Sequence, residues 1–198
     1  RFRNWDGDKR DYLRGFGYQG SASRGDWRRG VRELGIGADF KENISKPGPW
    51  TMGMTGFGEV LPYHENKIEL DRTKTDKWGL PVLSFDAQLR ENELKMRLDM
   101  KQDAVDMLEA SGFTNVNGWE SDYALGMGIH EMGTARMGTA PENSVLNKWN
   151  QVWDAPNVFI TDGAAMTSSS CVNPSLTYMA MTARAADYAV NELKKGNL

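Results

Sequence analysis

His130 is the first of two candidate catalytic residues in this sequence. It is one of two histidines among 198 residues, and it stands in the glycine-rich segment GIHEMGTARMG. A neutral imidazole can accept a proton near neutral pH, which makes His130 a candidate general base. The surrounding glycines would let the backbone make left-handed turns or approach a bulky planar ligand closely. A structural role for a lone histidine stays open, whereas metalloprotease chemistry is excluded because HEMGT lacks the second histidine of H-E-x-x-H.

Asn173 is the second candidate, since it stands before Pro174 at the start of a segment with helical periodicity. Asparagine is a strong helix N-cap and proline is tolerated at the first helical position, so a helix is predicted to begin here. The first turn of a helix carries unpaired amides and about half a positive charge, which suits an anion or a charge that develops during a reaction. Capping and catalysis are therefore compatible roles for Asn173. The apolar stripe predicted to pack against a sheet comprises Leu176, Met179, Ala180, Ala183, Ala186, Val190 and Leu193.

Several other elements would have to position these two residues. The run NVFITDG predicts a buried strand that ends in a turn at Asp162 and Gly163. Further upstream, the sequence predicts an antiparallel meander of three strands within residues 50–62, 66–71 and 80–89. An amphipathic helix over residues 91–111 follows, with Gly112 as its left-handed C-cap. Its apolar stripe comprises Leu94, Leu98, Val105 and Leu108.

The first part of the chain shows no sustained period. Residues 1–49 therefore read as long ordered loops that need neighbouring surface to pack on. Gly15, Gly17 and Gly20 satisfy the dinucleotide-binding pattern G-x-G-x-x-G, but that pattern works only between an apolar strand and a helix. Here KRDYLR precedes the glycines and SASRGDWRRG follows them, so this stretch is predicted to be a loop.

The composition is that of an ordinary globular protein, with 26% charged residues, 39% hydrophobic residues and a formal net charge of −3. Acidic residues interleave with the arginines near the N-terminus, which argues against a nucleic-acid partner. No apolar run approaches the roughly 20 residues that cross a bilayer, so no membrane span is expected. The single cysteine, Cys171, rules out an internal disulfide framework, and no metal site is expected.

Three blocks of the sequence resemble the C-terminal region of the glucose-methanol-choline (GMC) family of flavin oxidoreductases. They are HEMGTARMG, NVFITDGAAM and NPSLTYMAMTARAADY, and they follow one another in the family's order between Gly128 and Glu192. Upstream, residues 56–85 are similar to the substrate domain of bacterial members that oxidise sugars.

This resemblance implies an α+β fold. Residues 1–127, with the loop-rich segment 1–49, would be an antiparallel-sheet substrate domain with packed helices. Residues 128–198 would be the GMC C-terminal region. They would carry the catalytic loop and the strand and helix that complete a Rossmann-like FAD-binding domain.

The resemblance also implies an enzyme that moves a hydride from an alcohol or sugar carbon to N5 of FAD. His130 matches the family histidine that accepts the hydroxyl proton, and Asn173 matches the residue that hydrogen-bonds the substrate oxygen. Asp162 and Gly163 would lie at the ribityl and pyrophosphate portion of FAD. The helix start, with Asn173, Pro174, Ser175 and Thr177, would stabilise negative charge on the flavin.

The family's strand-glycine-helix FAD motif is not found in this sequence. The chain is therefore expected to be the C-terminal part of a longer enzyme, whose N-terminal FAD-binding part is its missing partner. Alone, it is expected to bind FAD poorly and to have no turnover. The identity of the alcohol or sugar, the electron acceptor and the compartment, bacterial cytoplasm or periplasm, stay open.

Two other functional classes compete with this interpretation. A carbohydrate-binding module without catalysis would use exposed tryptophans to stack on sugars, although tryptophan is also common core material. The candidates are Trp27, Trp50, Trp78 and Trp119. A hydrolase would use Ser168, Ser169, Ser170 or Cys171, but none of these lies in a glycine-flanked nucleophile turn.

Overall fold

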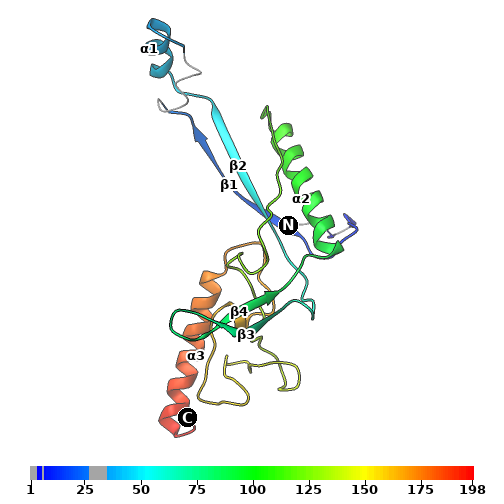
Figure 1. Cartoon of the computed structure of the whole chain (residues 1–198), viewed down its shortest axis with the longest axis vertical. Helices are drawn as coiled ribbons and strands as arrows, with labels where there is room; N and C mark the ends of the chain where they lie inside the picture. The colour runs from blue at the N-terminus through cyan, green and yellow to red at the C-terminus, as the bar shows by residue number, and fades with distance from the viewer. Residues whose placement is uncertain (1–3, 6, 27–34) are drawn as a thin grey trace.

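Two antiparallel hairpins and three α-helices organise the part of the chain that the structure describes. The computed structural model describes residues 4, 5, 7–26 and 35–198. Strand β1 (Phe16–Arg24) pairs with β2 (Trp50–Gly58), and α1 (Ala38–Ser45) lies in the connection between them. Strand β3 (Lys67–Thr75) pairs with β4 (Pro81–Asp86), and α2 (Glu91–Ala110) follows. A long irregular segment then leads through the short 3₁₀ turn η2 (Gly163–Ala165) to α3 (Ser175–Lys195). Figure 1 shows an elongated molecule with the β1–β2 hairpin at one end and α3 at the other.

The first core lies between α2 and one face of the β1–β2 hairpin. Tyr12, Phe16 and Met96 are its buried members, with Tyr18 and Met100 packed against them. The hydroxyl of Tyr18 donates to the carbonyl of Met100 over 2.6 Å, which ties the strand to the helix. Glycines face α2 on β2, because a Cβ at Gly56 would lie 2.5 Å from Sδ of Met100. The helix can therefore lie directly on the strand.

The second core lies between α3 and the irregular segment before it. Ala135, Leu146 and Ala165 are buried there, and Met181 of α3 packs against them. Asn150 is fully buried and donates from Nδ2 to the carbonyl of Ile160 over 3.0 Å. The amide of Ala135 donates to the carbonyl of Ala164 over 3.0 Å. Hydrogen bonds thus hold together a region that has little regular secondary structure.

The expected α+β class and the helix at 91–111 are confirmed, and Gly112 has the left-handed φ of 87° expected of a residue that ends a helix. The three-stranded meander is wrong. β2 pairs with β1, and β3 pairs with β4, so the predicted first and second strands belong to different sheets. The reason is the strand β1, which supplies β2 with a partner from the stretch predicted to be a loop.

The loop prediction for residues 1–49 is wrong at β1 and at α1. Gly17 and Gly20 lie within a strand whose neighbours Phe16 and Tyr18 alternate toward the first core. A Cβ on Gly20 would lie 2.6 Å from the carbonyl oxygen of Gly53, so close strand pairing accounts for this glycine. Rejecting the dinucleotide-binding pattern at these glycines agrees with the antiparallel strand found there.

The strand predicted in NVFITDG is also wrong, since this stretch makes only an isolated bridge between Gln151 and Phe159. The apolar stripe of α2 does not form the core either, because Leu94 and Leu98 are 49% and 56% exposed while Met96 faces the hairpin.

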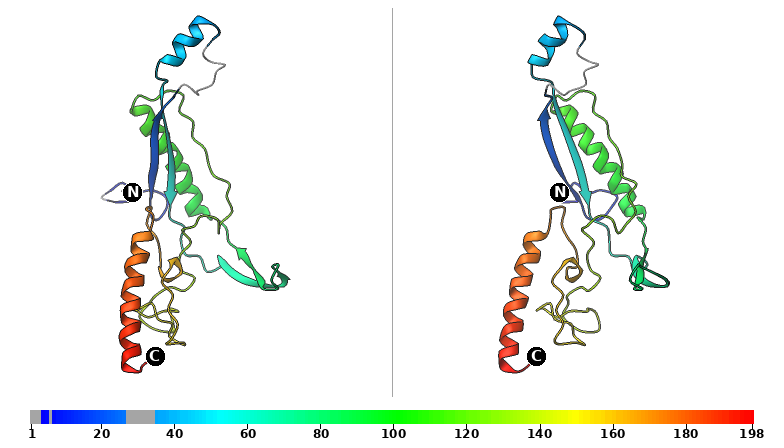
Figure 2. Two further views of the ribbon diagram at one scale, coloured as in Figure 1. Left: turned by 90° about the vertical axis from the view of Figure 1, so that its left-hand side faces the viewer. Right: turned by 60° about the vertical axis from the view of Figure 1, so that its left-hand side comes forward.

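The predicted stripe of α3 points away from the rest of the molecule. Leu176 is 79% exposed and Met179 is 68% exposed, whereas Met181 and Ala185 on the opposite face meet the second core or are buried. Figure 2 shows α3 flanked by chain on one side only. The accessible surface is 14448 Å², against about 9,400 Å² for a compact monomer of this mass. Much apolar surface is therefore unpaired in this chain.

Candidate functional site

His130 lies half-buried beside the β1–β2 hairpin. Its imidazole ring is 6.4 Å from the ring of Phe57 on β2, measured between centroids, and the planes are tilted by 36°. The loop before it passes close to β4, since a Cβ on Gly126 would lie 2.6 Å from Cδ1 of Phe85. Gly126 also has a φ of 94°, which favours glycine. Both hairpins therefore contact the segment that carries His130.

The residue before His130 has a strained backbone. Ile129 has a φ of 57°, a left-handed conformation that β-branched residues rarely adopt. Its side chain is 88% exposed, so packing of that side chain does not explain the conformation. The amide of Gly128 donates to Oε1 of Glu131 over 2.7 Å and closes a tight turn around these residues. The turn directs His130, and strain of this kind often occurs at functional sites.

The segment that carries His130 packs against the turn at Gly163. A Cβ on Gly163 would lie 2.9 Å from the hydroxyl of Tyr178 and 3.1 Å from the carbonyl oxygen of Glu131. The amide of Gly133 donates to the carbonyl of Gly163 over 3.4 Å. Only a residue without a side chain fits between the His130 segment and α3.

Asp162 is exposed and acts as the cap of η2, where its Oδ1 accepts a hydrogen bond of 3.0 Å from the amide of Ala164. Tyr178 lies nearby on α3, and its hydroxyl donates to Sδ of Met132 over 3.4 Å. Burial raises the pKa of Tyr178, and the charge of Asp162 raises it further. The hydroxyl therefore stays protonated and continues to link α3 to the His130 segment.

Asn173 is not the N-cap of α3, which corrects the sequence-based expectation. The helix begins at Ser175 with Pro174 as its N-cap, because the carbonyl of Pro174 accepts the first helical hydrogen bond from Tyr178. Among the described residues no side-chain hydrogen bond caps this end, and Ser175 and Thr177 are exposed. Oδ1 of Asn173 instead accepts a hydrogen bond of 3.4 Å from Nε2 of Gln19 on β1.

His130 and Asn173 meet the same face of the β1–β2 hairpin. Phe57 lies opposite Gly17, and Gln19 lies opposite Thr55, two positions further along both strands. Side chains two positions apart share a face of a sheet, so Phe57 and Gln19 point to the same side. This is the side opposite to the one that packs on α2. The structure thus brings the imidazole and the carboxamide, 43 positions apart in the chain, to neighbouring places on one surface.

A hollow of about 520 Å³ continues this surface along the hairpin. Trp119 stands at its edge and is 60% exposed. Hydroxyl and amide groups beside two aromatic rings are suited to a ligand with several hydroxyl groups. The lining residues are Gln19, Gly20, Ser21, Gly53, Met54, Thr55, Phe57 and Trp119. Gln19 and Phe57 were missed in the sequence, although the alternation of Phe16 and Tyr18 was a signal for β1.

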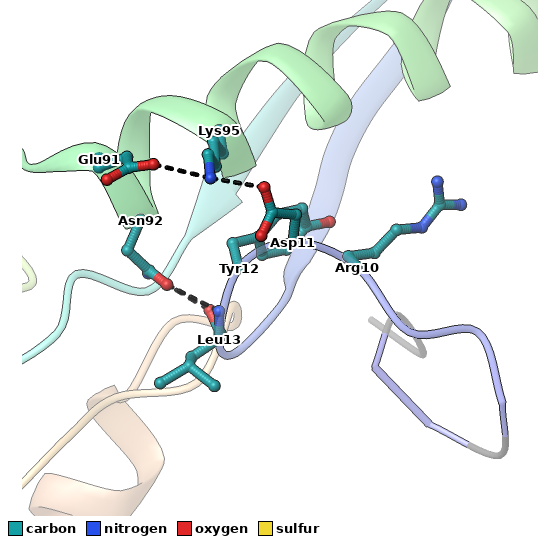
Figure 3. A pocket seen from close by; sticks show the side chains of 7 residues that line it. All are labelled: Arg10, Asp11, Tyr12, Leu13, Glu91, Asn92 and Lys95. Atoms are coloured by element: carbon teal, nitrogen blue, oxygen red, sulfur yellow. Dashed lines mark hydrogen bonds and ion pairs between the residues drawn. The ribbon is translucent and has the colours of Figure 1, made fainter.

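A second hollow, of about 390 Å³, lies where the N-terminal loop meets the start of α2 (Figure 3). Lys95 bridges Asp11 at 2.5 Å and Glu91 at 2.8 Å, and both carboxylates raise the pKa of its ammonium. The amide of Leu13 donates to Oδ1 of Asn92 over 2.7 Å. These charges satisfy one another, so the contacts hold the loop on the helix. Across residues 4, 5, 7–26 and 35–198, no cluster of three or more metal-binding side chains occurs, and no helix is long and apolar enough to cross a membrane.

The chain is similar to one family model and to several known bacterial proteins. Residues 62–182 match the family model described as GMC oxidoreductase. The chain is 40% identical over 135 residues to 2-methyl-1,2-propanediol dehydrogenase of Mycolicibacterium austroafricanum, covering 67% of this chain and 24% of that protein. It is 30% identical over 183 residues to the fructose dehydrogenase large subunit of Gluconobacter japonicus, covering 91% of this chain and 33% of that protein. A gluconate 2-dehydrogenase flavoprotein of Pantoea cypripedii is 26% identical over 166 residues, covering 78% of this chain and 27% of that protein. The chain thus spans about a quarter to a third of the length of these relatives.

Proposed function

Because this chain belongs to the GMC oxidoreductase family, we propose that it is the C-terminal part of an FAD-dependent enzyme that oxidises the CH–OH group of an alcohol or sugar. The observation that carries the proposal is the approach of His130 and Asn173 to one face of the β1–β2 hairpin. An imidazole and a carboxamide on one surface can act on a single hydroxyl group. The hollow beside them is lined by groups suited to a hydroxylated substrate.

His130 would accept the proton of the substrate hydroxyl, and Asn173 would donate a hydrogen bond to the same oxygen. As the proton leaves, the oxygen becomes more negative, so both a base and a donor at this atom lower the barrier. When bound, FAD would accept the hydride from the substrate carbon. The ring of Phe57 limits where the imidazole can lie, and the hydrogen bond from the Gly128 amide to Glu131 closes the turn that presents it.

The described residues fit a flavin cofactor. No side chain among the described residues caps the start of helix α3, so the amides of Ser175 and Thr177 can meet negative charge beside Pro174 and Asn173. Gly163 presents no side chain, and Asp162 holds the turn that carries it. We assign these six residues, Asp162, Gly163, Asn173, Pro174, Ser175 and Thr177, to FAD binding.

We also propose that the rest of the polypeptide covers the exposed stripe of α3. The exposed apolar stripe and the large accessible surface support this proposal. Both are expected if this chain and a preceding segment of the same polypeptide together form a Rossmann-like FAD-binding domain. Residues 1–127 would then be the substrate-domain portion and residues 128–198 the part that joins the FAD domain. Alone, the chain would bind FAD weakly and have no turnover, which titration of the purified 198-residue chain with FAD would test.

The direct test uses the full-length protein with the variants His130→Ala and Asn173→Ala. The rate of anaerobic flavin reduction is measured with 2-methyl-1,2-propanediol, D-fructose and D-gluconate. We expect His130→Ala to slow reduction by about 10²–10⁴-fold, as for loss of a general base. His64→Ala is the matched control, because His64 is the other histidine and is exposed in the connection between β2 and β3. Unchanged reduction in both site variants would refute the proposed chemistry.

A carbohydrate-binding module without catalysis is the second candidate. The exposed rings of Trp50, Trp78 and Trp119, which are 61%, 74% and 60% exposed, favour it. Trp27 lies outside the described residues. Under this alternative, sugar binding would be unchanged in the His130→Ala, Asn173→Ala double variant, and the full-length protein would oxidise none of the three compounds.

A further inference from the structure

Gln19 makes a contact that the proposed chemistry does not yet use. Its side-chain amide donates from Nε2 to Oδ1 of Asn173 over 3.4 Å, and the two residues are 154 positions apart. The backbone of Gln19 is held in place, since β1 pairs with β2 and the neighbouring Tyr18 is bonded to α2. Asn173 is not occupied in capping, because Pro174 is the N-cap of α3. The contact with Gln19 therefore favours the direction of the Asn173 carboxamide in which Oδ1 faces β1.

The two ends of a carboxamide are not equivalent. The oxygen only accepts hydrogen bonds, and the nitrogen donates two. To donate a hydrogen bond to a substrate oxygen, Asn173 must present Nδ2 rather than Oδ1. A donor that holds Oδ1 leaves both hydrogens of Nδ2 free for another partner.

We propose that Gln19 is a positioning residue, which holds Oδ1 of Asn173 so that Nδ2 faces the substrate oxygen. This inference rests on the proposed function of Asn173. Without Gln19, the carboxamide can turn over, and its oxygen then repels the substrate oxygen as that oxygen loses its proton. The repulsion grows toward the transition state, so its effect falls mainly on the rate of the reaction.

Two substitutions at Gln19 separate positioning from packing. Gln19→Met keeps the length of the side chain and removes the donor, and we expect flavin reduction in the full-length protein to slow by about tenfold. Gln19→Glu replaces the donor with an acceptor that attracts Nδ2 of Asn173, and we expect a larger loss of about a hundredfold. The loss should appear in kcat more than in KM. Gln102→Met and Gln102→Glu are matched controls, because Gln102 is exposed on α2 and bonds only to its neighbour Asp106 among the described residues.

A binding measurement provides a readout apart from turnover. The probe is 2-methyl-2-propanol, an alcohol whose carbinol carbon has no hydrogen to transfer. Its dissociation constant, followed by ligand-detected NMR, should rise severalfold in both Gln19 variants and in Asn173→Ala. The Gln102 variants should bind the probe as the unmodified protein does.

Combining each Gln19 substitution with Asn173→Ala tests whether Gln19 acts through Asn173. Once the carboxamide is absent, Gln19→Met and Gln19→Glu should cause no further loss. If Asn173→Ala slows reduction but both Gln19 variants leave the rate and the probe affinity unchanged, the positioning role is wrong and the proposed function stands. Equal losses for Met and Glu, or additive losses in the Asn173→Ala background, would also overturn the positioning role. If Asn173→Ala has no effect on reduction, the role proposed for Asn173 fails, and this inference fails with it.

Discussion

The imidazole ring of His130 lies 6.4 Å from the ring of Phe57, measured between centroids, although the two residues are 73 positions apart in the chain. Phe57 belongs to β2 and faces away from α2, whereas His130 belongs to the irregular segment that leads toward α3. The hairpin therefore provides the surface beside which His130, the proposed base, is placed. Substitutions on that surface should lower the rate of the proposed reaction more than they lower the free energy of unfolding.

Phe57→Ala should slow flavin reduction by about tenfold, because an aromatic contact contributes roughly 0.5–1.5 kcal/mol to holding the imidazole in place. Stopped-flow absorbance of the full-length protein measures this rate. Phe57→Tyr keeps the ring and should remain close to the unmodified protein. A fully active Phe57→Ala variant would show that the ring contact does not position His130.

Gly163→Ala should lower the free energy of unfolding by about 1–3 kcal/mol, since the added Cβ would lie 2.9 Å from the Tyr178 hydroxyl. The displaced His130 segment should also reduce the FAD content of the purified protein. Gly53→Ala is the matched control for stability, because a Cβ there meets no atom within 4 Å. Chemical denaturation compares the two variants, and equal stabilities would contradict the close packing at Gly163.

Ile129→Asn should raise the free energy of unfolding by about 1 kcal/mol, because asparagine tolerates the left-handed conformation better than a β-branched residue. Little burial is lost, since Ile129 is 88% exposed. Ile36→Asn is the control, as Ile36 is 94% exposed and does not have a positive φ. Thermal denaturation should separate the two, and a destabilised Ile129→Asn variant would count against strain at this turn.

Glu93 should make stability depend on pH. Burial alone would raise the pKa of its carboxyl, but hydrogen bonds from the amides of Leu61 and Arg90 outweigh it and lower the pKa below 4.5. The folded protein binds this proton more weakly than the unfolded chain does. The stability from Glu93 is therefore full above pH 4.5 and is lost as the pH falls through the lowered pKa.

Glu93→Gln should cost about 2 kcal/mol at neutral pH, and the cost should shrink in acid, because protonation of the unmodified protein removes the same charge. Urea denaturation at several pH values measures the difference. Glu91→Gln is the control, since Glu91 is an exposed partner of Lys95 and should change stability by under about 0.5 kcal/mol. A pH-independent cost at Glu93 would contradict the lowered pKa.

Val190→Glu tests the proposal that further chain covers α3. Val190 is 49% exposed here and belongs to the apolar stripe. If the stripe packs on the rest of the full-length protein, a buried charge should lower its melting temperature and its FAD content. Asn191→Glu adds the same charge beside the stripe and should have a smaller effect. Equal behaviour of the two variants would mean that the stripe remains exposed.

Local sequence patterns correctly predicted an element where periodicity and capping residues within that element were enough to define it. The helix at 91–111 and its end at Gly112 follow from periodicity and a glycine cap, and both are confirmed. The pairing of strands was beyond such reasoning, because β2 had two possible partners and only one of them looked like a strand. The start of α3 was predicted within two positions, but the role of Asn173 as its cap was wrong. A neighbour from β1 engages that side chain instead.

The sequence by itself determined the family, through the three blocks that contain His130, Asp162 and Asn173, because those side chains and glycines stand in a fixed order along the chain. It also determined the overall α+β class. Only the tertiary structure decided that Gln19 and Phe57 lie beside Asn173 and His130. That placement depends on which strand pairs with β2 and which face of the hairpin α2 covers. The strand pairing and the helix packing both join segments that are far apart in the sequence. No short stretch of sequence therefore contains both partners of either contact.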